Sequence, residues 1–260
     1  KGIVRPFKQP EYFDIVAREV QGALEADIKR PFFLDNNIGI GSRGGADVSE
    51  AAGLGHNIVA LCDVDENQLN PALDKVAKLS GDQPKRYKDY REMLAREKPE
   101  ICIVATPDHW HTPASILAME AGKHVYVEKP CSHNIREGRL LVETAQRTGK
   151  LLQVGTQSRS APFLQEAIKR LHDGEIGEII SAKAWNSQLR RNIGKTKPSE
   201  PPKTLDFALW QGPAPETPYR ANLLPGIWRW WYDFGCGDMG NDGVHDIDVT
   251  LWGMNVNTHP

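Results

Sequence analysis

The sequence predicts a doubly wound α/β domain followed by a second domain of mixed α and β structure. Short apolar runs alternate with helical stretches from residue 37 to about residue 155, which is typical of a parallel sheet covered by helices on both faces. This alternation of strands and helices ends after about residue 175. The chain has 260 residues, of which 40% are hydrophobic and 25% charged, so it is long enough for two domains.

The first 36 residues are interpreted as an arm ahead of the α/β domain. Within 12–28, apolar residues recur at the spacing of one helix face, which predicts an amphipathic helix that packs on another surface. Packing on a second copy is one such arrangement, and we expect a homo-oligomer. The chain starts at Lys1, which leaves open a cytoplasmic location and, after removal of a leader, a periplasmic one. The apolar face consists of Phe13, Val16, Val20, Leu24 and Ile28.

The α/β domain is assigned to 37–155. Ahead of its first helix only Ile38 and Ile40 are apolar, so the first strand is expected to be short. Later apolar runs predict buried strands, and the stretches between them predict helices. The strands are expected at 58–65, 101–106, 124–129 and 151–156, and the helices are expected up to Leu79, over 113–121 and over 135–148.

The second domain is assigned to 156–260, with the boundary between Gln153 and Gln157. It contains the run IGEIISAKAWNSQL, a proline-rich connection over 198–218, an aromatic cluster and one further helix. This order predicts a mixed, mostly antiparallel sheet beside the first domain.

Composition excludes several classes of partner. The net charge is −2, and Lys and Arg are scattered among acids, so no nucleic acid is expected as a partner. No apolar stretch reaches the roughly 20 residues of a membrane span. The cysteines are too far apart for metal knuckles or redox pairs and are expected as free thiols. They are Cys62, Cys102, Cys131 and Cys236.

Three glycines form the pattern of a dinucleotide-binding loop. Gly39, Gly41 and Gly44 give G-x-G-x-x-G, with Ser42 and Arg43 inside it, at the start of a predicted helix. Glycines in this pattern permit a tight turn and let a pyrophosphate approach the amides of the helix N-terminus. An ordinary glycine turn remains an alternative when the motif is taken alone.

A carboxylate follows these glycines at the expected separation. Asp63 ends the next strand, about 20 residues after the glycines, where it would accept hydrogen bonds from the ribose hydroxyls of NAD. The same carboxylate would repel the 2'-phosphate of NADP. NAD is therefore the favoured cofactor, and NADP is the less favoured one.

Two motifs lie at the carboxyl ends of predicted parallel strands, where open α/β sheets bind ligands. They are ATPDHWH at 105–111 and EKP at 128–130. We expect Lys129 to face the nicotinamide, against the alternative of a surface lysine that closes a strand. The two histidines have no third ligand nearby, so no metal is expected. The other residues expected at the cofactor are Thr106, Pro107, His109, His111 and Glu128.

These motifs, together with the later run GVHDID at 243–248, resemble the glucose-fructose oxidoreductase, inositol dehydrogenase and MocA family from about Ile38 to the end. The resemblance implies a Rossmann domain, a following domain with a large open sheet, and NAD or NADP in the crevice. It also implies hydride transfer to or from a sugar carbon. The family's catalytic lysine and histidine correspond to Lys129 and His245.

The chain departs from the family pattern in two respects. The family usually has Asp-x-Gly-x-His-x-x-Asp, and here Asn241 takes the first position, with Asp242 beside it. An amide cannot exchange protons as a carboxylate does, so the role that the family's Asp has in proton transfer is in doubt for Asn241. The chain also stops at Pro260, before the family's second domain is normally complete, and a fragment is expected.

Residues 240–242 predict the start of a helix, with Asn or Asp as its N-cap. On this helix Asn241, His245 and Asp248 share one face, so His245 and Asp248 are expected to point into a cleft as base and sugar-hydroxyl acceptor. A histidine pKa near neutrality suits proton transfer. The alternative is a histidine in an interdomain contact.

The second domain is unusually aromatic. Trp210, Trp228, Trp230 and Trp231 can stack on sugar rings or form a core, and the sequence leaves both open. Polar groups around them are expected to reach sugar hydroxyls. The expected substrate-binding residues are Asn186, Gln188, Trp228, Arg229, Asn241, Asp242 and Asp248.

The leading hypothesis is an NAD-dependent oxidoreductase that acts on a sugar, glycoside or cyclitol. A second hypothesis is glycoside cleavage through transient oxidation and elimination. The third is an NAD-binding subunit without catalytic activity.

Overall fold

The computed structural model describes residues 31–34 and 43–256, and its centre is a parallel sheet. Six strands lie in the spatial order β3-β2-β1-β4-β5-β6, and every neighbouring pair is parallel. This is the strand order of a doubly wound dinucleotide-binding domain, so the predicted architecture is confirmed. The strands are β1 (Pro31–Leu34), β2 (Ala60–Cys62), β3 (Lys85–Tyr87), β4 (Ile101–Val104), β5 (His124–Glu128) and β6 (Leu152–Gly155).

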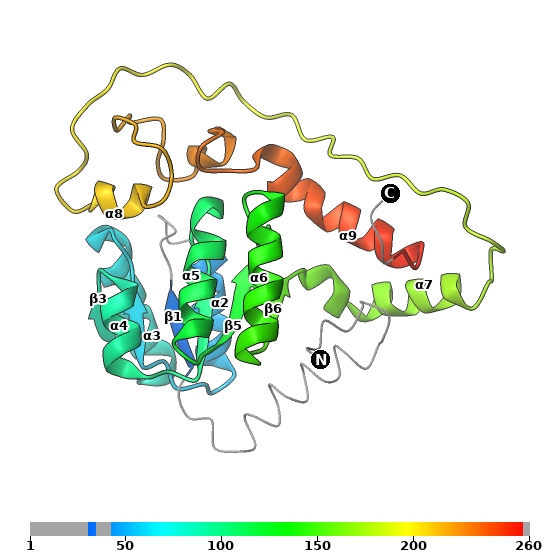
Figure 1. Cartoon of the computed structure of the whole chain (residues 1–260), viewed down its shortest axis with the longest axis horizontal. Helices are drawn as coiled ribbons and strands as arrows, with labels where there is room; N and C mark the ends of the chain where they lie inside the picture. Colours follow the sequence, from blue (N-terminus) through cyan, green and yellow to red (C-terminus); the bar gives the residue numbers. More distant parts are fainter. Residues whose placement is uncertain (1–30, 35–42, 257–260) are drawn as a thin grey trace.

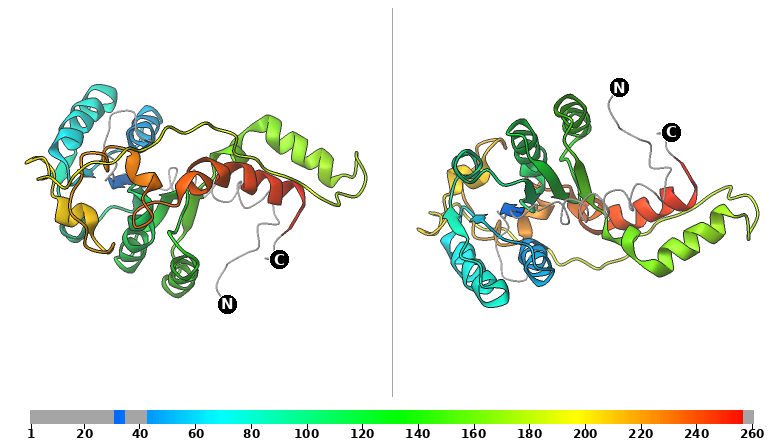
Figure 2. Two further views of the ribbon diagram at one scale, coloured as in Figure 1. Left: turned by 90° about the horizontal axis from the view of Figure 1, so that it is seen from above. Right: turned by 90° about the horizontal axis from the view of Figure 1, so that it is seen from below.

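Helices cover both faces of the sheet (Figures 1 and 2). One face packs on α2 (Arg43–Gly53) and α3 (Glu66–Ser80), through a core that includes Val48, Leu69 and Val76. The opposite face packs on α4 (Tyr90–Glu97), α5 (Asp108–Glu120) and α6 (Ile135–Thr148) through a second core. The near-continuous apolar strands are explained by this burial on two sides.

Two parts of the sheet differ from the prediction. The first strand, β1, lies at 31–34 rather than around Ile38, within the region assigned to the arm. The helix expected in 12–28 lies outside the described residues. The edge strand β3 was not predicted, because its sequence KRY is exposed and carries no buried apolar pattern.

Helix α5 begins earlier than the sequence indicated. It starts at Asp108, directly after Pro107 at its N-cap position, and not at Pro113. Proline is favoured in the first turn of a helix, which is where the expected range 113–121 placed Pro113, but in the structure Pro113 lies inside α5. His109 and His111 are therefore helical residues and not loop residues. By contrast α6 spans the expected 135–148.

The second part of the chain contains α7 (Pro162–His172), α8 (Phe207–Gln211) and α9 (Val244–Gly253). Between α7 and α8 the chain runs extended across the top of the molecule in Figure 1. Trp210, Trp228 and Phe234 form the centre of a third core, which joins the aromatic segment to the end of β2 through Val64.

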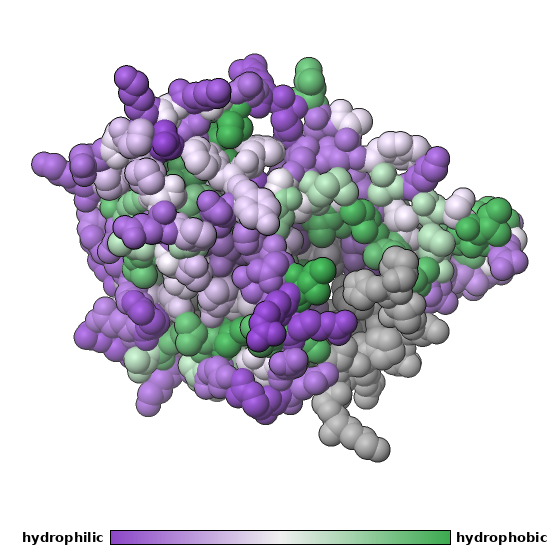
Figure 3. Space-filling model, turned by 45° about the horizontal axis from the view of Figure 1, so that its top comes forward, coloured by the Kyte–Doolittle hydropathy of each residue, from purple (hydrophilic) through white to green (hydrophobic). Residues whose placement is uncertain are grey.

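The expected antiparallel sheet is not formed by residues 176–256 of this structure. This region has only one isolated bridge of its own, Pro198 with Arg220, and a second one to Asp65 from Leu205. A strand requires a neighbour for its backbone N–H and C=O groups, and among the described residues no neighbouring strand lies beside 178–197. Its apolar side chains remain exposed, as at Ile180 (87%) and Leu189 (99%). Figure 3 shows such an apolar surface at the right-hand end of the molecule.

Among the described residues, no helix is both long and apolar enough to cross a membrane. The four cysteines are free thiols, as predicted.

Candidate functional site

The candidate site lies at the carboxyl edge of the sheet, where β4 and β5 end. The segment between α8 and α9 crosses this edge (Figure 1). Asp108, which follows β4, accepts a hydrogen bond from the Cys236 amide at 2.9 Å. Lys129, which follows β5, donates from Nζ to the main-chain carbonyl of Asn241. Residues more than 100 positions apart thus meet at the edge that doubly wound folds use for ligands.

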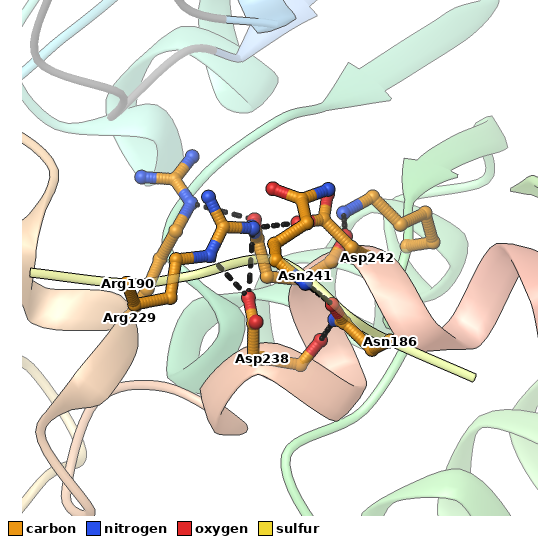
Figure 4. A network of polar contacts seen from close by, with 8 residues as sticks. Asn186, Arg190, Arg229, Asp238, Asn241 and Asp242 are labelled. Carbon is orange, nitrogen blue, oxygen red and sulfur yellow. Dashed lines mark hydrogen bonds and ion pairs between the residues drawn. The ribbon is translucent and has the colours of Figure 1, made fainter.

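Asn241 is the point at which two cationic side chains converge. Its carbonyl oxygen accepts from Lys129, and its side-chain Oδ1 accepts from Arg229 Nε at 3.1 Å. Figure 4 shows Asn241 and Arg229 within the polar network around this residue. The amide that replaces the expected carboxylate is therefore a hydrogen-bond acceptor for a guanidinium.

Asn241 and Asp242 do not cap a helix, contrary to the prediction. They lie inside the π-helical turn η3 (Met239–Gly243), which continues directly into α9. A Cβ at Gly240 would lie 2.3 Å from the Cβ of Cys236, so glycine is needed for this close approach. Single π turns occur often at functional sites, because the wider turn re-aims side chains.

His245 lies one residue into α9, beside Lys129. Its side chain is half-buried, and within the described part of the chain its Nδ1 has no hydrogen-bond partner. Burial, followed by the positive charge of Lys129, lowers the pKa of His245 below its usual value. Both effects favour the neutral imidazole, which is the form that can accept a proton.

A second polar network holds the extended segment against η3. Arg190 donates to Asp238 at 2.9 Å and also contacts Asp242, while Asn186 Nδ2 donates to the Asp238 carbonyl at 3.1 Å. Figure 4 shows these side chains meeting above the turn. Asn186 and Asp242, both predicted to bind substrate, are brought to the site but are engaged with protein groups. Gln188 is exposed.

Trp228 is a core residue, contrary to the prediction that it binds substrate. It is only 2% exposed, because its ring packs inside the third core. The Arg229 guanidinium carbon lies 4.3 Å above the centroid of this ring. Trp210 is also fully buried, whereas Trp230 and Trp231 are half-buried. The core alternative thus holds for Trp210 and Trp228.

Asp248 is a paired carboxylate and not the open hydroxyl acceptor that was predicted. Both of its oxygens accept hydrogen bonds of 2.7 Å from Arg159. Arg159 was missed by the sequence analysis. Its only signal was a charged residue shortly after β6, in a turn that is otherwise small and polar.

The nucleotide end of the edge fits NAD. Gly44 is buried in the first turn of α2, and a Cβ at Gly45 would meet nothing within 4 Å. Asp63 is buried (3% exposed) directly after β2, where ribose hydroxyls are recognised. Of the other residues assigned to this loop, Gly39, Gly41 and Ser42 lie outside the described residues, and the side chain of Arg43 does too.

Two buried polar atoms between these ends have no protein partner in the described part. They are Thr106 Oγ1, after β4, and His111 Nε2. The other ring nitrogen of His111 contacts the Pro130 carbonyl at 2.6 Å, which fixes the ring beside Lys129. Buried polar groups normally have a partner, and a bound cofactor would supply one here. Pro107, also predicted at this site, is the N-cap of α5.

His109 was predicted to line the cofactor site, but the structure places it in a core. It is 3% exposed, and its Nε2 and Nδ1 contact the carbonyls of Trp210 at 3.1 Å and Phe234 at 3.3 Å. Burial lowers the pKa of His109 to about 4. This residue therefore joins α5 to the third core.

Glu128 belongs to a buried cluster that the sequence revealed only in part. Gln157 Nε2 donates to Glu128 Oε1 at 2.6 Å, and Tyr126 OH donates to the same oxygen at 3.1 Å. A Cβ at Gly155 would lie 2.7 Å from that oxygen. The Lys129 amide donates to the other Glu128 oxygen at 3.3 Å, so the cluster orients the strand end that carries Lys129.

Comparisons with known proteins agree with the fold. A model of the Gfo/Idh/MocA group, described as an oxidoreductase family with an NAD-binding Rossmann fold, matches residues 38–156. A second model of the same family, describing a C-terminal alpha/beta domain, matches residues 180–257. Together the two models extend over most of the chain.

One curated relative is a protein of Shewanella baltica named as a glycosyl hydrolase family 109 protein. It is 32% identical over 152 residues, which cover 56% of this chain and 33% of the relative. The similarity thus spans about a third of the relative's length.

Two solved structures are also similar. Myo-inositol 2-dehydrogenase from Lactobacillus plantarum is 27% identical with a TM-score of 0.50, over 58% of this chain and 43% of that one. The WlbA dehydrogenase from Chromobacterium violaceum, solved with NADH and UDP-GlcNAcA, is 23% identical with a TM-score of 0.59. That match covers 86% of this chain and 54% of the other and shows a shared fold.

Proposed function

Because the chain belongs to the Gfo/Idh/MocA oxidoreductase family, with its NAD-binding Rossmann domain and C-terminal alpha/beta domain, we propose that it oxidises or reduces a carbon of a sugar, glycoside or cyclitol. NAD supplies the hydride acceptor or donor when it is bound. The observation that carries the proposal is the position of Lys129, which donates to the Asn241 carbonyl in the turn that leads into the His245 helix and lowers the pKa of His245 through its charge.

Lys129 and His245 divide the work at the reacting carbon. Lys129 Nζ stabilises the substrate oxygen as charge develops on it. His245, kept neutral by burial and by the charge of Lys129, accepts the hydroxyl proton while hydride leaves the same carbon. In the reverse direction His245 returns the proton to the carbonyl oxygen. Asn241 holds Lys129 in position and does not itself transfer a proton.

The proposal is tested by following NADH formation with purified protein and a panel of polyols, sugars and methyl glycosides. NADH should appear with at least one of them. Lys129→Ala should lower kcat by about 10²–10³-fold, the range seen when one donor that stabilises a developing oxyanion is removed. Unchanged turnover in this variant would exclude Lys129 from the catalytic step.

A second candidate function is glycoside cleavage, which the name of the Shewanella baltica relative favours. In this reaction the sugar would be transiently oxidised by NAD, would eliminate its aglycone as an alcohol, would add water in its place and would be reduced again by the NADH formed. The same Lys129 and His245 would serve the oxidation and reduction steps. The two functions are separated by product analysis with p-nitrophenyl glycosides. Release of nitrophenol that requires NAD but leaves no accumulated NADH indicates cleavage, whereas a stoichiometric rise in NADH indicates net oxidation.

A further inference from the structure

We propose that Arg229 binds a carboxylate of the substrate, so that the preferred sugar is a uronic acid or its glycoside. The proposal deepens the proposed function and rests on it. The starting point is the guanidinium of Arg229, which lies beside the residues proposed for catalysis. Among the described residues, no carboxylate forms an ion pair with it.

The contacts of Arg229 are with neutral groups. Nε donates to Asn241 Oδ1 at 3.1 Å, Nη1 donates to the Gly226 carbonyl at 3.3 Å, and the guanidinium lies over the Trp228 ring. Within the described chain, Nη2 has no acceptor. The Nη1–Nη2 end of the fork therefore retains N–H groups that can donate side by side to the two oxygens of a carboxylate.

The neighbouring arginines differ from Arg229 in this respect. Arg190 pairs with Asp238 at 2.8 Å, and Arg159 pairs with Asp248 at 2.7 Å. The carboxylate that acts on Arg229 through its charge is Asp108, and Asp108 accepts the hydrogen bond of the Cys236 amide instead.

Burial makes this arrangement costly unless an anion is bound. The pKa of Arg229 is lowered by desolvation, so the half-buried cation is less stable than it would be in water. A buried charge is normally paired. A substrate carboxylate would offset the desolvation, and the hydrogen bonds of Nε and Nη1 together with the Trp228 ring beneath the guanidinium restrict its movement.

The position also limits which part of the substrate carries the charge. Arg229 and Lys129 bind the side-chain and main-chain oxygens of the same residue, Asn241. We therefore expect the carboxylate and the reacting carbon to belong to one sugar unit. The cofactor pyrophosphate is expected at the other end of the edge, at the N-terminus of α2, so Arg229 is not placed to receive it.

The test compares sugars that differ only in this group. Methyl β-D-glucuronide is paired with methyl β-D-glucoside, and the galacto-configured pair is measured alongside. For the unmutated protein, kcat/KM should favour the uronide by about 10–100-fold, as expected for a charge-assisted bidentate contact. Equal values for both members of both pairs would overturn the proposal.

Arg229→Gln should lower kcat/KM for the uronide much more than kcat/KM for the neutral sugar, so that the preference is abolished. Arg229→Lys keeps the charge but loses the fork, so an intermediate preference is expected. Arg170→Gln is the matched control, because Arg170 is an exposed residue of α7 that pairs with Glu175. It should leave the preference unchanged. Circular dichroism checks that each variant is folded.

A binding measurement separates failure of this proposal from failure of the proposed function. Calorimetry with the NADH-loaded protein titrates methyl β-D-glucuronide and methyl β-D-glucoside in the absence of turnover. If no sugar is oxidised but the uronide binds at least about 10-fold more tightly and loses this advantage in Arg229→Gln, the carboxylate site stands and the catalytic assignment falls. Turnover of neutral sugars with no preference in binding would leave the function intact and exclude the carboxylate site.

Discussion

Arg159 holds Asp248 through two parallel hydrogen bonds, Nε to Oδ2 and Nη2 to Oδ1, each 2.7 Å long. Arg159 also lies 5.2 Å above the Trp252 ring, and its side chain is only 4% exposed. The pair connects the turn after β6 to α9, the helix that carries His245. The position of His245 at the sheet edge thus depends on an ion pair between the two parts of the chain.

Loss of this pair should destabilise the protein strongly. Arg159→Met leaves a mostly buried carboxylate without its partner, and we expect the free energy of unfolding to fall by about 3–5 kcal/mol. Denaturant unfolding measures the change. Arg170→Met, which breaks the exposed pair with Glu175, should cost less than about 1 kcal/mol. Equal losses in the two variants would contradict this prediction.

The buried His109 should make the protein sensitive to acid. Its pKa is about 4 in the folded protein, against a usual value of 6.5. As the pH falls from 6.5 to 4, the unfolded chain therefore takes up a proton that the folded chain does not. The free energy of unfolding should therefore fall by about 3 kcal/mol between pH 6.5 and pH 4.

The His109 prediction is checked by the pH dependence of the unfolding free energy. His109→Gln should remove most of the slope between the two pKa values, while His172→Gln, on the exposed surface of α7, should retain it. An identical slope in His109→Gln and the unmutated protein would mean that other groups cause the acid sensitivity.

Asp63 should set the cofactor preference. Its buried carboxylate after β2 places negative charge where the 2'-phosphate of NADP would lie, so NAD should bind more tightly than NADP. Asp63→Ala should weaken NAD binding and narrow the difference in affinity between NAD and NADP. Fluorescence titration with NADH and NADPH measures both constants. Tighter binding of NADPH by the unmutated protein would refute the assignment.

His245 and Asn241 should respond differently to substitution. His245→Ala should lower turnover by about 10²–10⁴-fold, as expected when a positioned base is removed. Asn241→Asp should retain the fold and measurable activity, because a carboxylate oxygen can still accept from Arg229. Both variants are compared at saturating cofactor. If His245→Ala keeps a near-normal rate while changing Asp242 or Asp248 abolishes activity, the base is a carboxylate and not His245.

The lowered pKa of His245 should appear in the pH profile. Proton abstraction requires neutral imidazole, so kcat/KM should rise with pH through the pKa of His245, with a midpoint below the usual histidine value of 6.5. Replacing Lys129 with methionine removes a charge that lowers this pKa, so the His245 titration should move to higher pH. NMR of the histidine ring signals follows the titration without turnover. A titration that does not move would show that Lys129 is too far from His245 to act on it.

Much of the fold was predictable because it depends on local patterns. Apolar runs indicated β2, β4, β5 and β6, and capping residues explain why α6 was placed correctly: Asn134 accepts from the Glu137 amide at 3.0 Å. The edge strand β3 and the turn η3 carried no comparable signal. Their form depends on the neighbours against which they pack.

Hydrophobic periodicity and glycine spacing are local properties of the chain, so they were enough to predict the parallel sheet, the edge of the sheet at which Lys129 lies, and the candidate cofactor. The pairing of Lys129 with His245 was implied by the family resemblance. The partners of the polar groups are known only from the folded arrangement of the chain. It showed that Asp248 is occupied by Arg159, that Trp228 is buried beneath Arg229, and that His109 lies in a core. Burial and ion pairing depend on residues far apart in the chain, and spacing along one segment contains no information about them.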